Sequence, residues 1–358
     1  MEPVKYRVTW KTFALPIIGL AAFFIYLYIF QVDIQEVIAR AREINPYLYL
    51  LAAIASLLDT LFFTLAWRSL LGYLSVRISR FKAFMFVYVG IFVDTLIPAE
   101  SVSGELTRIY LVNREQDGAA GKATASVVAQ RLIGTGISIS TLIVGAILLI
   151  VENMLYGMMI YLILSLIIIG LITFTLIILL CVQESWTLRI VNAAIKFAER
   201  ISRGRWKLAK LREEVIEAAR SFHTAMKEYA HAPKTILVSV SFSVVAWILT
   251  LIVFYLTFLS IGYTQISWSV ILVVSAIFIA VKSVPVGIPF EVGLPEFTLT
   301  FLFSSVFLIP LEISTLATLL TRFLTSWLRF FMGFAAEQWV GIKVTTTGES
   351  NETRSTKD

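Results

Sequence analysis

The sequence predicts an all-α, polytopic integral membrane protein, and three observations lead to that fold class. Hydrophobic residues make up 58% of the chain and charged residues only 15%. The mean hydropathy of +0.84 lies well above that of a soluble domain. Apolar stretches of about 20 residues, the length that crosses a bilayer as a helix, recur along the chain. Proline and glycine break two of these stretches.

About eight transmembrane helices are expected, because a spanning helix needs about 20 apolar residues. They cover residues 13–30, 46–66, 81–97, 121–150, 154–181, 234–262, 267–285 and 312–341. The first is expected to be an anchor rather than a cleaved signal peptide, since more spans follow and a small-residue cleavage site is missing. Together they form one transmembrane domain, residues 1–342. The Ser/Thr/Glu-rich segment 343–358 is predicted to be a disordered cytoplasmic tail.

Basic residues in the connections predict the orientation, since cytoplasmic loops carry an excess of lysine and arginine. The segment before the first span and the connection 68–82 are basic, whereas the connections at 152–153 and 262–265 contain no lysine or arginine. The chain is therefore expected to be a multi-pass protein of the cell membrane with both termini in the cytoplasm.

The hydrophilic segment 184–231 is expected to form an amphipathic, helical cytoplasmic insertion, because apolar residues recur at helical spacing among lysines and arginines. Two interpretations stay open: a helix pair that lies on the anionic inner leaflet, or a solvated hairpin that caps the domain. The surrounding region 182–234 supplies most of the net charge of +6. The positive-inside orientation of a membrane protein explains this net charge, so no nucleic-acid partner is expected.

The sequence offers no catalytic or metal-binding motif. Cys181 is the only cysteine, which excludes an internal disulfide and a cysteine-based metal site. His223 and His231 lie in the hydrophilic segment and form no HExxH motif. Neither a nucleophile–base pair nor a phosphate-binding glycine loop is visible, so no enzyme activity, cofactor or metal is expected.

The two broken stretches match each other, because a proline and two glutamates of the first recur at a constant separation in the second. The matching residues are Pro98 with Pro289, Glu100 with Glu291, and Glu105 with Glu296. The loop charges predict that the first hairpin enters the membrane from the cytoplasm and the second from outside. The repeat units 46–150 and 237–341 are therefore expected to have opposite topology. Inverted repeats whose broken segments meet near the midplane are a recurrent plan of secondary transporters. The alternative is a chance match.

Prolines and glycines at the breaks are predicted to set the shape of these re-entrant hairpins. Proline removes a backbone donor and clashes with the preceding turn, while glycine allows a positive φ or a close helix approach. The predicted hinge residues are Pro98, Gly104, Pro285, Gly287, Pro289, Gly293 and Pro295.

Ionisable residues cluster at both breaks, although a charge at the centre of a membrane helix costs about 2.5–3.5 kcal/mol. The candidate substrate-binding residues are Asp94, Glu100, Glu105, Arg108 and Arg131 at the first break, and Lys282, Glu291, Glu296 and Arg322 at the second. Glu105 is expected to approach Arg131, and Glu296 to approach Arg322. With the amino ends of the half-helices, the arginines are expected to bind an anionic head group such as a lipid phosphate. The alternative is that each pair only fastens its hairpin.

The motif residues resemble those of the lysylphosphatidylglycerol synthase transmembrane region, also called the flippase-like domain family. The likeness covers most of residues 10–342 and rests on Pro98, Gly104-Glu105, Arg108, Tyr110-Leu111, Arg131, the segment 285–296 and Arg322. It implies an integral membrane domain with re-entrant segments that moves lipids across the bilayer. A stand-alone member is expected, because the soluble aminoacyl-transferase domain of the multiple peptide resistance factor is missing. Synthase activity is then not implied.

These inferences predict a lipid translocase of the flippase-like kind, with membrane lipids that carry an anionic head group as its partners. The cargo would be an anionic phospholipid or a polyprenyl-phosphate-linked lipid, moved by alternating access at the paired hairpins. Two alternatives stay open. One is an intramembrane lipid-modifying transferase that uses Glu105 or Glu296 as its base, and the other is a non-transporting partner that docks a glycosyltransferase through residues 184–231.

Overall fold

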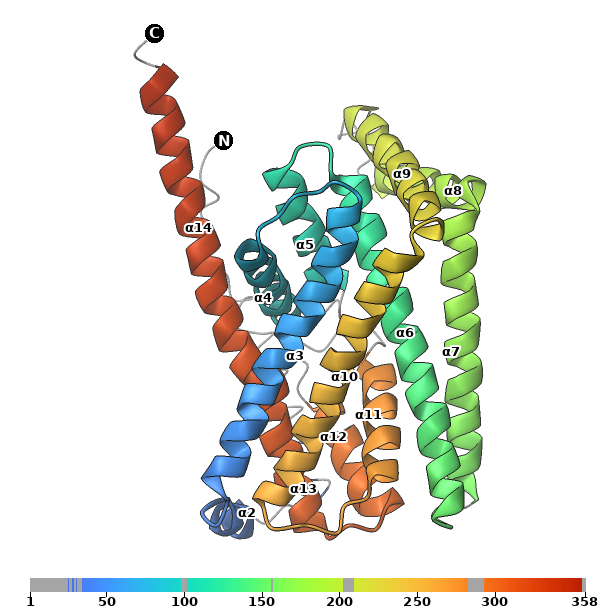
Figure 1. Cartoon of the computed structure of the whole chain (residues 1–358), viewed down its shortest axis with the longest axis vertical. Coiled ribbons are helices and arrows are strands. Elements are labelled where there is room, and N and C mark those ends of the chain that lie inside the picture. Colours follow the sequence, from blue (N-terminus) through green and yellow to red (C-terminus); the bar gives the residue numbers. More distant parts are fainter. Residues whose placement is uncertain are drawn as a thin grey trace. The chain divides into compact units, whose positions relative to one another are not determined.

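The computed structural model describes residues 34–97, 102–155, 157–201, 209–282 and 293–355, together with the isolated positions 25, 28 and 30. Within these segments every regular element is a helix (Figure 1). Four of the helices are long and apolar enough to cross a membrane. The predicted fold class, an all-α polytopic membrane protein, is therefore confirmed. Most of the predicted first span lies outside the described residues.

The helices follow one another along the whole described chain. They are α2 (Ile34–Ala41), α3 (Pro46–Tyr73), α4 (Arg80–Leu96), α5 (Val102–Glu115), α6 (Ala120–Val151), α7 (Met158–Val182), α8 (Glu184–Ile201), α9 (Ala209–Ala230), α10 (Pro233–Ser260), α11 (Trp268–Lys282), α12 (Leu294–Phe301), the π-helix η2 (Leu302–Val306), α13 (Leu311–Arg322), the π-helix η3 (Phe323–Trp327) and α14 (Leu328–Ser355). The four long apolar helices are α3, α6, α7 and α10.

The predicted spans match these helices closely. The two that were expected to be short form α4, of 17 residues, and α11, of 15 residues. The last predicted span corresponds to the consecutive helices α13, η3 and α14. The tail differs from its prediction, because α14 continues to Ser355 through the segment expected to be disordered. A helix that already exists adds one hydrogen bond per residue without a new nucleation step, which is how polar sequence can extend it.

The chain divides into two compact units. Unit 1 contains residues 1–54, 88–104 and 252–358, and unit 2 contains residues 55–87 and 105–251. These units do not coincide with the predicted repeats, because residues 88–104 of the first repeat belong to the unit that holds most of the second. Unit 1 therefore combines a segment of the first predicted repeat, residues 88–104, with most of the second.

In unit 1, the second half of α4 packs against α14. The ring of Phe92 lies 5.2 Å from that of Phe330 and 5.8 Å from that of Phe334, measured between ring centres. A methyl group on Gly333 would overlap the backbone carbonyl of Tyr88. The absence of a side chain at Gly333 thus lets the two helices approach closely.

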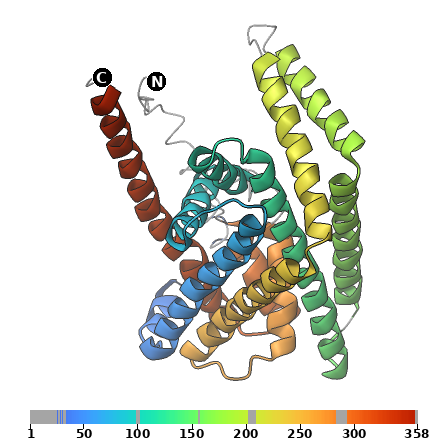
Figure 2. The same ribbon diagram turned by 45° about the horizontal axis from the view of Figure 1, so that its top comes forward.

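In unit 2, α9 packs along α6, and Figure 2 shows α8 and α9 running side by side as a hairpin. A methyl group on Gly121 of α6 would overlap the carbonyl oxygen of Ala218 in α9. Tyr229 anchors the end of α9 by donating its hydroxyl hydrogen to the carbonyl of Leu70 at 3.0 Å. Burial raises the pKa of this hydroxyl, so Tyr229 stays a protonated donor.

This packing distinguishes the two helices of the predicted insertion. The apolar face of α9, with Ala219, Phe222 and Ala225, is buried against the protein, as in the predicted hairpin that caps the domain. Helix α8 instead exposes Trp186 and Ile190, which leaves it an apolar surface that is available to lipid.

We expect Gly121→Ala to lower the unfolding midpoint of the detergent-solubilised protein. The added methyl group would push α9 from α6, and overpacking of this kind typically costs about 1–3 kcal/mol. Gly134→Ala is the matched control, because Gly134 lies in the same helix and has open space around it. Circular dichroism during heating measures both variants, and equal midpoints would contradict the proposed close contact.

Candidate functional site

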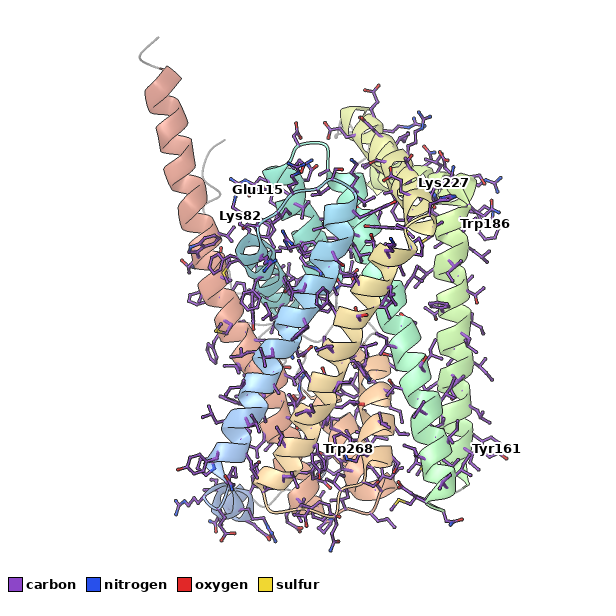
Figure 3. The ribbon with its side chains drawn as sticks, in the orientation of Figure 1. Lys82, Glu115, Tyr161, Trp186, Lys227 and Trp268 are labelled. Carbon is purple, nitrogen blue, oxygen red and sulfur yellow. The ribbon has the colours of Figure 1, made fainter. Side chains whose placement is uncertain are left out.

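The first predicted break joins α4 and α5, which form a helical hairpin. Near its tip, Ser103 donates its hydroxyl hydrogen to Asp94 Oδ1 at 2.6 Å, and the backbone amide of Gly104 donates to the same oxygen at 3.2 Å. A Cβ atom on Gly104 would lie only 2.7 Å from the carbonyl oxygen of Gly90. Gly104 is therefore a position of close helix approach, and Asp94 caps the start of α5. At the open end of the hairpin, Lys82 and Glu115 form an ion pair (Figure 3).

The second predicted break ends where α12 begins. Gly293 precedes the helix with a φ of +101°, a left-handed conformation that favours glycine. Its backbone amide donates to Glu296 Oε2 at 2.6 Å, so Glu296 caps its own helix, and Pro295 lies in the first turn. Gly293 and Pro295 thus have the shape-setting role that was predicted for them.

The amino ends of the half-helices were expected to offer backbone amides to an anionic head group. One amide at the start of α5 and one before α12 donate to Asp94 and Glu296. The positive end of a helix dipole stabilises a nearby carboxylate. The first turn of a helix has further amides, so head-group binding at these ends stays a prediction.

In unit 1, Glu296 also accepts a hydrogen bond from Arg322, as predicted. Arg322 Nε lies 2.6 Å from Glu296 Oε1, and the two side chains are only 2% and 3% exposed. Arg322 Nη1 donates to Ser326 Oγ, and the guanidinium carbon lies 6.0 Å from the ring centre of Phe278. Protein atoms enclose this pair, which fastens α12 to α13.

In unit 2, the corresponding pair is open. Arg131 Nη1 lies 2.9 Å from Glu105 Oε2, and the side chains are 34% and 22% exposed. Glu105 and Arg131 are separated by the same 26 positions as Glu296 and Arg322. Both predicted pairs are thus present, with equal spacing and unequal access.

Arg108 lies one turn from Glu105 on α5 and is almost completely buried. Its Nη1 donates to Gln130 Oε1 at 3.1 Å, and its guanidinium carbon lies 4.9 Å from the ring centre of Trp67 and 5.4 Å from that of Phe63. An aromatic face stabilises a cation in this arrangement. Arg108 therefore holds α5 against α3 and α6 beside the open pair.

Sequence reasoning missed Gln130, which is central to this network. Its amide also donates to the carbonyl of Phe63 at 2.9 Å. The signal was available, because Gln130 directly precedes Arg131 inside an apolar span, where a polar side chain needs a partner. Trp67 gave no comparable signal, since tryptophan is ordinary in a membrane helix.

The remaining predicted site residues fall into two groups. Lys282 is half-buried at the last position of α11, where a cation complements the negative end of the helix dipole. Six predicted residues lie outside the described segments, and their roles stay predictions: Pro98, Glu100, Pro285, Gly287, Pro289 and Glu291. Among the described residues, no group of three histidine, cysteine, aspartate or glutamate side chains could hold a metal ion.

Comparison with known families identifies one that covers most of the chain. The family model of the lysylphosphatidylglycerol synthase transmembrane region matches residues 16–333, which contain both ion pairs. The chain belongs to this family. The match extends from before α2 into α14, and it supports a membrane location for the protein.

Archaeal relatives show the same extent of likeness. The chain is 23% identical over 332 residues to a UPF0104 membrane protein of Pyrococcus horikoshii, a match that covers 90% of this chain and 95% of the relative. It is 25% identical to one from Methanothermobacter thermautotrophicus, with coverage of 86% and 90%. A third, from Methanocaldococcus jannaschii, is 26% identical with coverage of 93% and 96%. The likeness thus covers almost the whole length of each relative.

We expect Arg322→Ala to destabilise the protein far more than Arg131→Ala. Removing Arg322 leaves the Glu296 carboxylate buried without its cation, which typically costs about 3–5 kcal/mol, whereas loss of an exposed pair costs about 1 kcal/mol or less. Thermal unfolding in detergent compares the two variants. The double variant Glu296→Gln/Arg322→Ala should recover part of the loss, and equal destabilisation by both single variants would show that the two pairs do not differ in burial.

Proposed function

We propose that this protein translocates lipids and that Arg131 binds their anionic head group. The observation that carries the proposal is the unequal access of the two equivalent pairs. Arg322 is enclosed by protein atoms, whereas the Arg131 side chain is 34% exposed. An arginine that recognises a ligand must be accessible, and Arg131 is the more accessible of the two.

The chemistry of the open pair suits a phosphate group. A guanidinium has five N–H donors, and the bond to Glu105 involves only Nη1. Charge-assisted bonds from arginine to phosphate are about twice as strong as neutral hydrogen bonds and are often bidentate. A phosphate can therefore bind beside Glu105, or replace it, while the buried Arg108 and Gln130 hold α5 against α6.

The predicted inverted repeat supplies a route across the membrane. Hairpins that enter from opposite sides give access to opposite leaflets in turn, while the hydrocarbon chains of the cargo stay in the bilayer. Membership of the family of the lysylphosphatidylglycerol synthase transmembrane region supports lipids as the cargo. Phospholipids and polyprenyl-phosphate-linked lipids share the phosphate that Arg131 would bind, so the test includes both. The proposal places the protein in the cell membrane with both termini in the cytoplasm.

Reconstitution into liposomes tests the proposal directly. The wild-type protein should carry a fluorescent head-group-labelled phosphatidylglycerol or polyprenyl phosphate between leaflets, measured as the fraction accessible to an external quencher. Arg131→Ala should lower the rate of lipid movement between the leaflets at least about tenfold, because a hydrogen bond to a charged group contributes about 1.5–3 kcal/mol. Arg114→Ala is the control, since Arg114 is exposed on the same hairpin outside both pairs. A wild-type rate equal to that of protein-free vesicles with every lipid would refute the proposal.

A charge swap separates head-group binding from fastening. Glu105→Arg combined with Arg131→Glu keeps an ion pair between α5 and α6 but moves the cation to the other helix. We expect this double variant to regain the thermal stability lost in either single variant while transport stays low. If transport recovers together with stability, the pair is only a fastener. Chromatography of the recovered lipids tests the transferase alternative, which requires a modified product.

A further inference from the structure

A second region of unit 2, lined by residues other than those of the ion pairs, has the properties of a lipid site. An apolar cavity of about 380 Å³ lies among α6, α7, α8 and α9, and we refer to it as the α6–α9 cavity. Its walls include Val128 of α6, Ile177 and Cys181 of α7, Ile190 of α8 and Phe222 of α9. This volume lies within the range of about 300–1,000 Å³ that is typical of ligand sites.

The lining of the cavity offers little to a polar ligand. Its two hydroxyl groups are already used, because Thr124 donates to the carbonyl of Ala120 at 2.8 Å and Thr187 donates to that of Leu180 at 2.9 Å. Cys181, the only cysteine in the chain, behaves as a small apolar side chain when buried. Apolar cavities exclude water and bind apolar molecules. The ligand must therefore be hydrocarbon where it contacts the walls.

Aromatic residues place the cavity at the edge of the hydrocarbon layer. Tyr161 and Trp186, which are 75% and 45% exposed, lie at opposite ends of α7 (Figure 3). Such residues are enriched at the two membrane–water interfaces. The cavity lies at the carboxyl end of α7, next to the amphipathic α8 that contains Trp186, which is the level expected for the boundary between lipid chains and head groups.

A lining residue of α8 is exposed, and a cation of α9 bonds to the residue that follows another lining residue. Ile190 lines the cavity and is also 56% exposed. Arg212 of α9 donates to Asn192 Oδ1 of α8 at 3.3 Å, and Asn192 directly follows the lining residue Val191. This arginine is exposed and donates to a neutral amide, and its guanidinium has further N–H donors for a lipid phosphate.

We propose that the α6–α9 cavity binds one hydrocarbon chain of an anionic phospholipid from the surrounding bilayer, with the phosphate beside Arg212. Such a lipid fills the space between the spans and the cytoplasmic hairpin and joins α8 to α7. The site lies among other residues than the Glu105–Arg131 pair and does not depend on translocation. Its ligand is a resident lipid rather than the cargo.

Bound lipids can be counted by native mass spectrometry of protein released from nanodiscs. From discs of mixed phosphatidylglycerol and phosphatidylcholine, the wild-type protein should retain one phosphatidylglycerol more than Val128→Phe, whose larger side chain fills the cavity. Val144→Phe is the matched control, because it makes the same change on an exposed face of the same helix. Equal lipid retention by the two variants would overturn the proposal.

The single cysteine provides a test that needs no core substitution. In nanodiscs, N-ethylmaleimide should label Cys181 more slowly with phosphatidylglycerol than with phosphatidylcholine, because a retained chain covers the thiol. Arg212→Ala should abolish this difference between the lipids, while Arg114→Ala should preserve it. Equal labelling rates of the wild-type protein in both lipids would refute binding of an anionic lipid in the cavity, whatever the outcome of the transport assay.

Discussion

An arginine in an apolar helix needs an acceptor, and this requirement governs how the two broken segments are held. The cost of an unpaired charge in hydrocarbon amounts to a few kcal/mol, so each hairpin must bring a carboxylate to the span that follows it. Glu105 does so for Arg131, and Glu296 for Arg322. The separation along the chain is the same in both cases, and in each case an ion pair connects a short helix after the break to the next helix.

The two pairs differ in their surroundings. Around Arg322 the protein provides a second acceptor in Ser326, an aromatic neighbour in Phe278 and almost complete burial, which is what a desolvated pair needs to be stable. Helix α13 ends at Arg322 and continues as the π-helix η3. Arg131 lies in a regular α-helix, and its pair is more exposed. This difference in access underlies the proposal that Arg131 recognises the head group.

The positive ends of the half-helices lie next to carboxylates of the protein itself. Asp94 and Glu296 each accept an amide hydrogen bond there, and the proposal assigns recognition of an anionic head group to Arg131. A similar division holds for the hydrophilic insertion. Helix α9 packs on α6, whereas α8 keeps exposed apolar residues beside an apolar cavity. Lipid contacts are therefore proposed at two places in unit 2, one polar and one apolar.

The sequence by itself determined the class of the protein, most of its helices and the partners within both ion pairs. Hydropathy is enough for the helices, since hydrocarbon accepts few structures other than helices of about 20 residues, and charges in such helices must be paired. Only the tertiary structure decided that Arg322 is enclosed while Arg131 is open, that Gln130 and Trp67 hold Arg108, and that residues 88–104 pack with the second half of the chain. Burial and the exchange of segments depend on which helices meet in space, and neither hydropathy nor spacing along one chain contains that information.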